Sequence, residues 1–206
     1  MSFVGALSSS DVLLGGEVCR GWWLVDDAAG ASRLVAGPFP ERSDAQWAGV
    51  GEPGSATRPV YGIRRADGGL TRQPSPQDWA WLAHLGEQLE RLPGDWDAVL
   101  SDEDPLTTLV VEVTAALSEA GLALHDDAGP AAEAGGACLI PEPELGGIVV
   151  TWRQHDRMSV DQVHGVAADF VVQQAMNRAL AEVLAARGFV VDAFGGASGH
   201  VVRPAA

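Results

Sequence analysis

Lysine is absent from this 206-residue sequence, and all 13 basic residues are arginines. The chain therefore has no residue for Schiff-base catalysis, no lysine general base and no P-loop lysine to hold a nucleotide phosphate. Arginine codons are GC-rich and lysine codons are AT-rich. Together with the abundance of alanine, glycine and valine, this composition indicates a high-GC bacterial genome.

Cysteine and long apolar runs are also scarce. The two cysteines, Cys19 and Cys138, lie far apart and form no C-x-x-C motif, which excludes a zinc ribbon or a thioredoxin-like site. We expect two buried thiols in a reducing cytoplasm. No apolar run approaches the roughly 18 residues of a membrane span, and residues 1–16 lack the basic region of a signal peptide. The sequence predicts a soluble, cytoplasmic protein that binds no membrane.

The net charge of −15 arises from 28 acidic residues against 13 arginines. The acidic excess is spread along the whole chain and is densest over residues 87–104, which hold seven acids and one arginine. Such a charge repels the phosphates of DNA and RNA, so direct nucleic-acid binding is not expected. The charge permits a basic protein as partner. A special case is that this protein mimics DNA and occupies the binding surface of a nucleic-acid-binding partner.

Short β-rich segments occur in pairs and alternate with segments of helical periodicity. The order ββα-ββα-αββ-αββ predicts an α+β fold, with antiparallel sheets built from about four hairpins and helices on one face. We expect a flexible arm over residues 1–17, an N-terminal half over 18–100 and a C-terminal half over 101–206. The two halves could be similar in topology or form one compact domain, although no residue-level repeat is present.

Four of the predicted helices carry start signals. Ser75 with Pro76 and Asp104 with Pro105 are typical of a helix N-cap followed by proline at the first helical position. Ser43 is expected to cap a short helix, and Ser159 a longer one that ends near Arg187. In the helix that follows Ser75, helical spacing predicts a buried apolar stripe of Trp79, Leu82, Leu85, Leu89 and Leu92.

Tryptophan placement suggests a partner surface. Trp22 and Trp23 are neighbours in a predicted strand and must point to opposite faces, and Trp81 lies off the helical stripe that contains Trp79. Two elements thus carry a large aromatic side chain on each side. We interpret Trp22 and Trp81 as candidates for a homodimer interface. The alternatives are a second layer within the chain and an exposed aromatic that binds a ligand.

The densest polar cluster is His155-Asp156-Arg157, with His164 nine residues after His155. An imidazole, a carboxylate and a guanidinium at a strand end are a candidate catalytic base, orienting group and anion clamp. His155, Asp156 and His164 are also metal-ligand types, but their spacing matches no metal motif, and we predict no metal or cofactor. The alternative is a turn that leads into a helix, with Arg157 in a surface ion pair. His125, which begins a His-Asp-Asp run, is expected in a solvated loop.

The only concentration of basic residues is on the second predicted hairpin, beside Tyr61: Arg58, Arg64, Arg65 and Arg72. These arginines are candidates for gripping an acidic ligand or nucleic acid. In a chain this acidic, pairing with the protein's own carboxylates is the alternative.

The sequence contains no G-x-S-x-G or H-E-x-x-H motif and no G-x-G-x-x-G that opens a helix. We therefore favour a non-enzymatic interaction or regulatory protein that binds a protein partner through acidic and aromatic surfaces. The alternative is a small-molecule binder or enzyme with a pocket around His155, Asp156 and Arg157.

Overall fold

The computed structural model describes residues 19–27, 32–50, 57–94, 104–126, 129, 134–159 and 166–205. The predicted arm, residues 95–103 of the acidic segment 87–104, and His164 lie outside these residues. The chain divides into two compact units, Met1–Ala80 (unit 1) and Trp81–Ala206 (unit 2), and the division falls within helix α2. Within the described residues, no helix is long and apolar enough to cross a bilayer.

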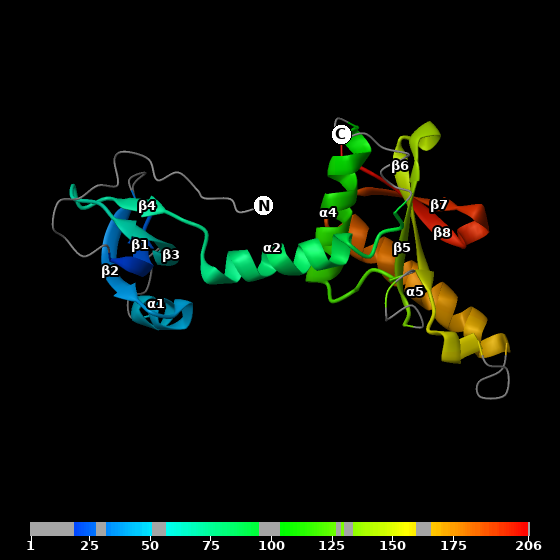
Figure 1. Cartoon of the computed structure of the whole chain (residues 1–206), viewed down its shortest axis with the longest axis horizontal. Helices are drawn as coiled ribbons and strands as arrows, with labels where there is room; N and C mark the ends of the chain where they lie inside the picture. Colours follow the sequence, from blue (N-terminus) through cyan, green and yellow to red (C-terminus); the bar gives the residue numbers. More distant parts are fainter. Residues whose placement is uncertain are drawn as a thin grey trace. The chain divides into compact units, whose positions relative to one another are not determined.

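Unit 1 is a four-stranded antiparallel sheet with one packed helix (Figure 1). The strand order is β2-β1-β3-β4, so the first strand of each hairpin lies in the centre. A register shift beside Leu24 interrupts the pairing of β1 with β2. The elements are β1 (Arg20–Asp26), β2 (Arg33–Phe39), α1 (Arg42–Gly49), β3 (Thr57–Arg64) and β4 (Leu70–Arg72), followed by the start of α2 (Pro76–Leu89).

The two neighbouring tryptophans of β1 are both buried on opposite faces of this sheet. Helix α1 covers the face of Trp22, where Arg42 lies 5.7 Å from the centre of the indole and Tyr61 meets it edge-on. On the other face, the Trp23 indole N–H donates to the Gly62 carbonyl at 3.1 Å. Both indoles are therefore packed within the chain.

Unit 2 has two layers, with helices on one face of a four-stranded antiparallel sheet. The strand order is β5-β6-β8-β7, so here the second strand of each hairpin lies in the centre, and the two sheets are connected differently. Beyond the end of α2, the principal elements are α4 (Pro105–Glu119), β5 (Gly136–Glu142), β6 (Gly147–Arg153), α5 (Val166–Ala186), β7 (Val190–Phe194) and β8 (Gly199–Arg203).

The core of unit 2 lies between α4, α5 and one face of the sheet (Figure 1). Alternation along each strand turns every second side chain toward the helices, and helical spacing does the same for α4. The most completely buried members of this cluster are Val113, Leu117, Ile148, Leu184 and Val202. The α+β class, the four hairpins and their order with the helices are therefore as predicted.

Two predicted helix starts are confirmed in atomic detail. The Ser75 hydroxyl accepts the Asp78 N–H at 3.2 Å, and the Asp78 carboxylate accepts the Ser75 N–H at 2.7 Å, which is a reciprocal capping arrangement. The bond from the Ser75 backbone N–H, followed by a bond that the Ser75 hydroxyl donates to the same carboxylate at 2.8 Å, holds the pKa of Asp78 below its usual value. At the start of α4, Asp104 accepts the Leu106 N–H at 2.8 Å.

One other helix start differs from the prediction. Helix α1 begins at Arg42, after Glu41, whose side chain makes no capping bond. Ser43 therefore lies inside the helix. Ser159 ends a short 3-10 turn, η3 (Asp156–Ser159), and α5 is described from Val166 onward. Residues 160–165 lie outside the described residues, so the cap predicted at Ser159 stays a prediction.

The buried stripe predicted along α2 is wrong in its first half. Trp79 and Leu82 are 62% and 51% exposed, whereas Leu85 is buried. The C-terminal part of this region is held within unit 2, because the Gln88 side chain accepts the Leu124 N–H at 2.9 Å and Leu92 packs on the core. The spacing of apolar residues does not show which turns of a helix have a surface to pack against.

Two expectations of burial are also corrected. His125 is buried rather than solvated, because its N–H donates to the Ala137 carbonyl at 2.9 Å and residues 123–125 thereby run alongside β5. Cys19 is exposed, since it precedes the first residue of β1, and Cys138 is half-buried.

Candidate functional site

The His155-Asp156-Arg157 cluster lies at the surface, where β6 leads into η3. All three side chains are exposed. The Arg157 N–H donates to the His155 Nδ1 at 3.1 Å, and Asp156 faces Arg153 at 3.7 Å. Within the described ranges, no group of three His, Cys, Asp or Glu side chains is placed to hold a metal ion. The geometry is that of an exposed turn with local polar contacts.

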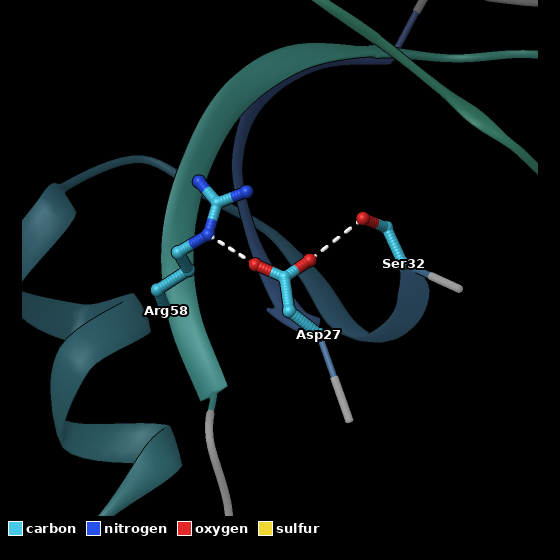
Figure 2. A network of polar contacts seen from close by, with 3 residues as sticks. All are labelled: Asp27, Ser32 and Arg58. Atoms are coloured by element: carbon cyan, nitrogen blue, oxygen red, sulfur yellow. Dashed lines mark hydrogen bonds and ion pairs between the residues drawn. The ribbon is translucent and has the colours of Figure 1, made fainter. Parts of the chain in front are cut away.

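The four arginines of the second hairpin are separated by the structure into different environments. Arg58 is paired with Asp27, and Arg65 is paired with Asp67 at 2.5 Å in the adjoining turn. Figure 2 shows Asp27 between Arg58 and Ser32, whose hydroxyl donates to the same carboxylate at 2.6 Å. Two of the four predicted ligand-binding arginines thus contact the protein's own acids.

Asp27 is the centre of this network. The hydrogen bond from Ser32 is the largest cause that lowers its pKa, followed by the bond from Arg58, and Arg72 adds a smaller electrostatic contribution. All of these contacts favour the ionised carboxylate. The network ties the ends of β1, β2 and β3 together. Of the four hairpin arginines, Arg64 has no carboxylate partner in the described part of the chain.

The aromatic side chains that reach the surface are mostly not those predicted from the sequence. Trp22 is buried beneath α1, and Trp81 is half-buried with its ring 5.8 Å from that of His84. Within the described residues, the large exposed aromatics are Trp47 in α1, Trp79 in α2, Phe170 in α5 and Phe194 in β7.

The second face of the unit 2 sheet contributes nothing to the helix-covered core. Ile140, Val149, Val201 and Asp192 form one row across the four strands on this face. The two central valines are buried by their neighbours, while Ile140 at the β5 end is 48% exposed.

Strand β7 forms one end of this sheet, and no described strand pairs with its outer side. Val190 and Phe194, at its two ends, are 45% and 38% exposed. Asp192 lies between them in sequence and is paired with Arg203 of β8 at 2.5 Å. The edge therefore offers backbone hydrogen-bonding groups flanked by two apolar side chains.

A buried asparagine joins α5 to the sheet, and sequence reasoning missed it. Asn177 Oδ1 accepts the Trp152 N–H at 2.8 Å, and Asn177 Nδ2 donates to the Ser198 carbonyl at 2.9 Å. The Thr151 hydroxyl donates to the same Ser198 carbonyl at 2.9 Å. Since Asn177 satisfies the end of β6 and the β7–β8 turn at once, it fixes the position of the hairpin that carries the open edge.

His200 gives unit 2 a predictable response to acid. Burial lowers the pKa of this half-buried histidine, and its Nδ1 has no partner among the described residues. Because the pKa of His200 is lower in the folded state, the unfolded chain takes up a proton first as the pH falls. The free energy of unfolding is therefore highest above the unfolded pKa and decreases as the pH falls toward the folded pKa. Between pH 7 and pH 5 the urea midpoint should therefore fall more in the wild type than in His200→Gln. An identical fall in both proteins would show that His200 contributes nothing to the pH dependence.

No protein-family model, curated protein or solved structure matches the chain. The function therefore has to be argued from the geometry described above.

Proposed function

We propose that the chain is a non-enzymatic interaction protein that binds an extended segment of a protein partner along β7. The observation that supports this most directly is the open edge of β7 with Val190 and Phe194 exposed at its two ends. A partner strand added there would satisfy the free backbone groups of β7 and bury both apolar side chains.

The other three sheet edges are less suited to strand addition. β4 has only three residues. β2 is interrupted by a register shift and contains Pro38. β5 contains Pro141 and is already paired with Leu124. Short strands, prolines and irregular pairing are common means of blocking an edge, and β7 has neither a proline nor an irregular register with β8.

The charge of the protein indicates the chemistry of the partner segment. With a net charge of −15 and Asp192 in the middle of the edge, a neutral or basic segment with apolar side chains at alternate positions is favoured. A second copy of the chain is less suitable, because symmetric pairing of β7 about its centre would place two Asp192 carboxylates opposite each other. A second copy of the chain, as in the homodimer predicted from the tryptophans, is therefore the alternative partner for the β7 edge.

A pocket around His155, Asp156 and Arg157 is the competing proposal. No observation favours it, since the three side chains are exposed and their described contacts are local.

Photo-crosslinking tests the proposed edge. With benzoylphenylalanine in place of Phe194, we expect an adduct in a lysate of the native host whose crosslinked peptide has apolar residues at alternate positions. Adding Val190→Glu should weaken capture by about tenfold or more, because burial of the valine is lost and a charge is placed at the edge. Mass spectrometry of the adduct provides the readout.

The matched control places the same crosslinker at Val111, which is 37% exposed on α4 of the same unit. Equal capture from Val111 would indicate non-specific adhesion. An adduct of the chain with itself would support the homodimer, and capture that is insensitive to Val190→Glu would contradict binding along β7.

A further inference from the structure

Unit 1 contains an open groove of about 760 Å³, which is within the range of ligand-binding pockets. Residues 32–37, from the start of β2, form one side of it, and Gly68 and Gly69 of the β3–β4 turn form another part. Trp23 contributes to the lining, and its indole is fixed by the bond to the Gly62 carbonyl. The groove belongs to unit 1 and is independent of the β7 edge proposed above.

Two arginines, Arg33 and Arg64, line this groove and are exposed. Neither forms an ion pair within the described residues, whereas Arg58 and Arg65 of the same sheet do. The described lining includes one carboxylate, Asp26, so positive charge is in excess locally. In a protein with a net charge of −15, a groove with this balance is suited to a ligand that carries negative charge at specific points.

The spacing of the two arginines indicates the size of the ligand. Arg33 pairs in register with Asp26 at the end of β1, and Arg64 follows Ile63, which pairs with Arg20 at the beginning of β1. Six residues of strand correspond to roughly 20 Å. An extended peptide of about six residues spans that backbone separation and can contact both arginines.

We propose that the groove of unit 1 binds an extended acidic peptide segment, whose carboxylates contact Arg33 and Arg64 and whose backbone lies over the region of Trp23. Guanidinium–carboxylate bonds are stronger than neutral hydrogen bonds and select carboxylates by their planar geometry. Single-stranded nucleic acid is the alternative occupant, and the experiment below distinguishes it from an acidic peptide.

Fluorescence polarisation with labelled hexaglutamate and the full chain tests this proposal. We expect saturable binding that Arg33→Gln and Arg64→Gln each weaken about fivefold or more. Arg65→Gln is the matched control, because Arg65 lies next to Arg64 but is paired with Asp67 and does not line the groove. This variant should bind hexaglutamate as the wild type does. Circular dichroism of each variant verifies that unit 1 remains folded.

Hexaglutamine and hexalysine should not bind, and free glutamate should compete only at far higher concentration than hexaglutamate. The proposal is overturned by absence of hexaglutamate binding, by equal losses in Arg64→Gln and Arg65→Gln, or by equally strong competition from free glutamate. Tighter binding of single-stranded oligothymidylate than of hexaglutamate would also overturn it and would identify a nucleic-acid site.

Discussion

Leu117→Ala is expected to lower the free energy of unfolding of unit 2 by about 3–5 kcal/mol. Leu117 is completely buried between α4 and the sheet, and its neighbours in the core come from both helices and from β5, β6 and β8. Removing the side chain forfeits its transfer free energy and leaves a cavity that close-packed neighbours fill only in part. Urea unfolding followed by circular dichroism measures the loss.

Val111→Ala is the matched control for this measurement, since Val111 lies on the same helix with a 37% exposed side chain. Its effect should stay below about 1 kcal/mol. Equal losses for the two variants would contradict the orientation of α4 and the position of the core.

Asn177→Leu is expected to destabilise unit 2 by about 2–4 kcal/mol, although leucine is more hydrophobic and fits a helix well. The substitution leaves the part-buried Trp152 N–H without its acceptor and takes one donor from the Ser198 carbonyl. Such groups cannot regain water without opening the packing between α5 and β6. The same urea titration provides the measurement.

The control for Asn177 is Gln174→Leu, one turn earlier on α5, where the side chain is exposed. Its effect should be within about 0.5 kcal/mol. If Asn177→Leu were neutral or stabilising, the two hydrogen bonds would not anchor the β7–β8 turn, and the fixed geometry of the open edge would need another cause.

Local signals in the sequence were sufficient for the elements and for several of their ends. Ser75 with Asp78 and Asp104 with Pro105 specify helix starts through bonds that span three residues or fewer, so no tertiary information is needed. Alternating apolar residues likewise predicted the hairpins and their order with the helices.

Features that depend on packing between distant segments were not predictable in this way. The burial of His125 follows from pairing with β5, and the exposure of Trp79 follows from where α2 ceases to pack. Asn177 bonds to residues 25 and 21 positions away, and a lone asparagine in an apolar helix gives only a weak sign of such a role.

The candidate surfaces show the same division. Sequence reasoning found the arginine-rich hairpin, but it could not show that Arg58 and Arg65 are paired while Arg64 lines a groove with Arg33. Nor could it identify β7 as an open edge, because strand order depends on which strands of two hairpins meet. In unit 2 these are β6 and β8, which leaves β7 at the end of the sheet.

Hydrogen–deuterium exchange on the complex with the captured partner tests the central claim most directly. Amides in Val190–Phe194 that point away from β8 should exchange rapidly in the free protein and slow by about tenfold or more on binding, because a partner strand would accept their hydrogen bonds. Amides of β5 should be unchanged. Protection around His155–Arg157 without protection of β7 would contradict strand addition and would favour the competing site.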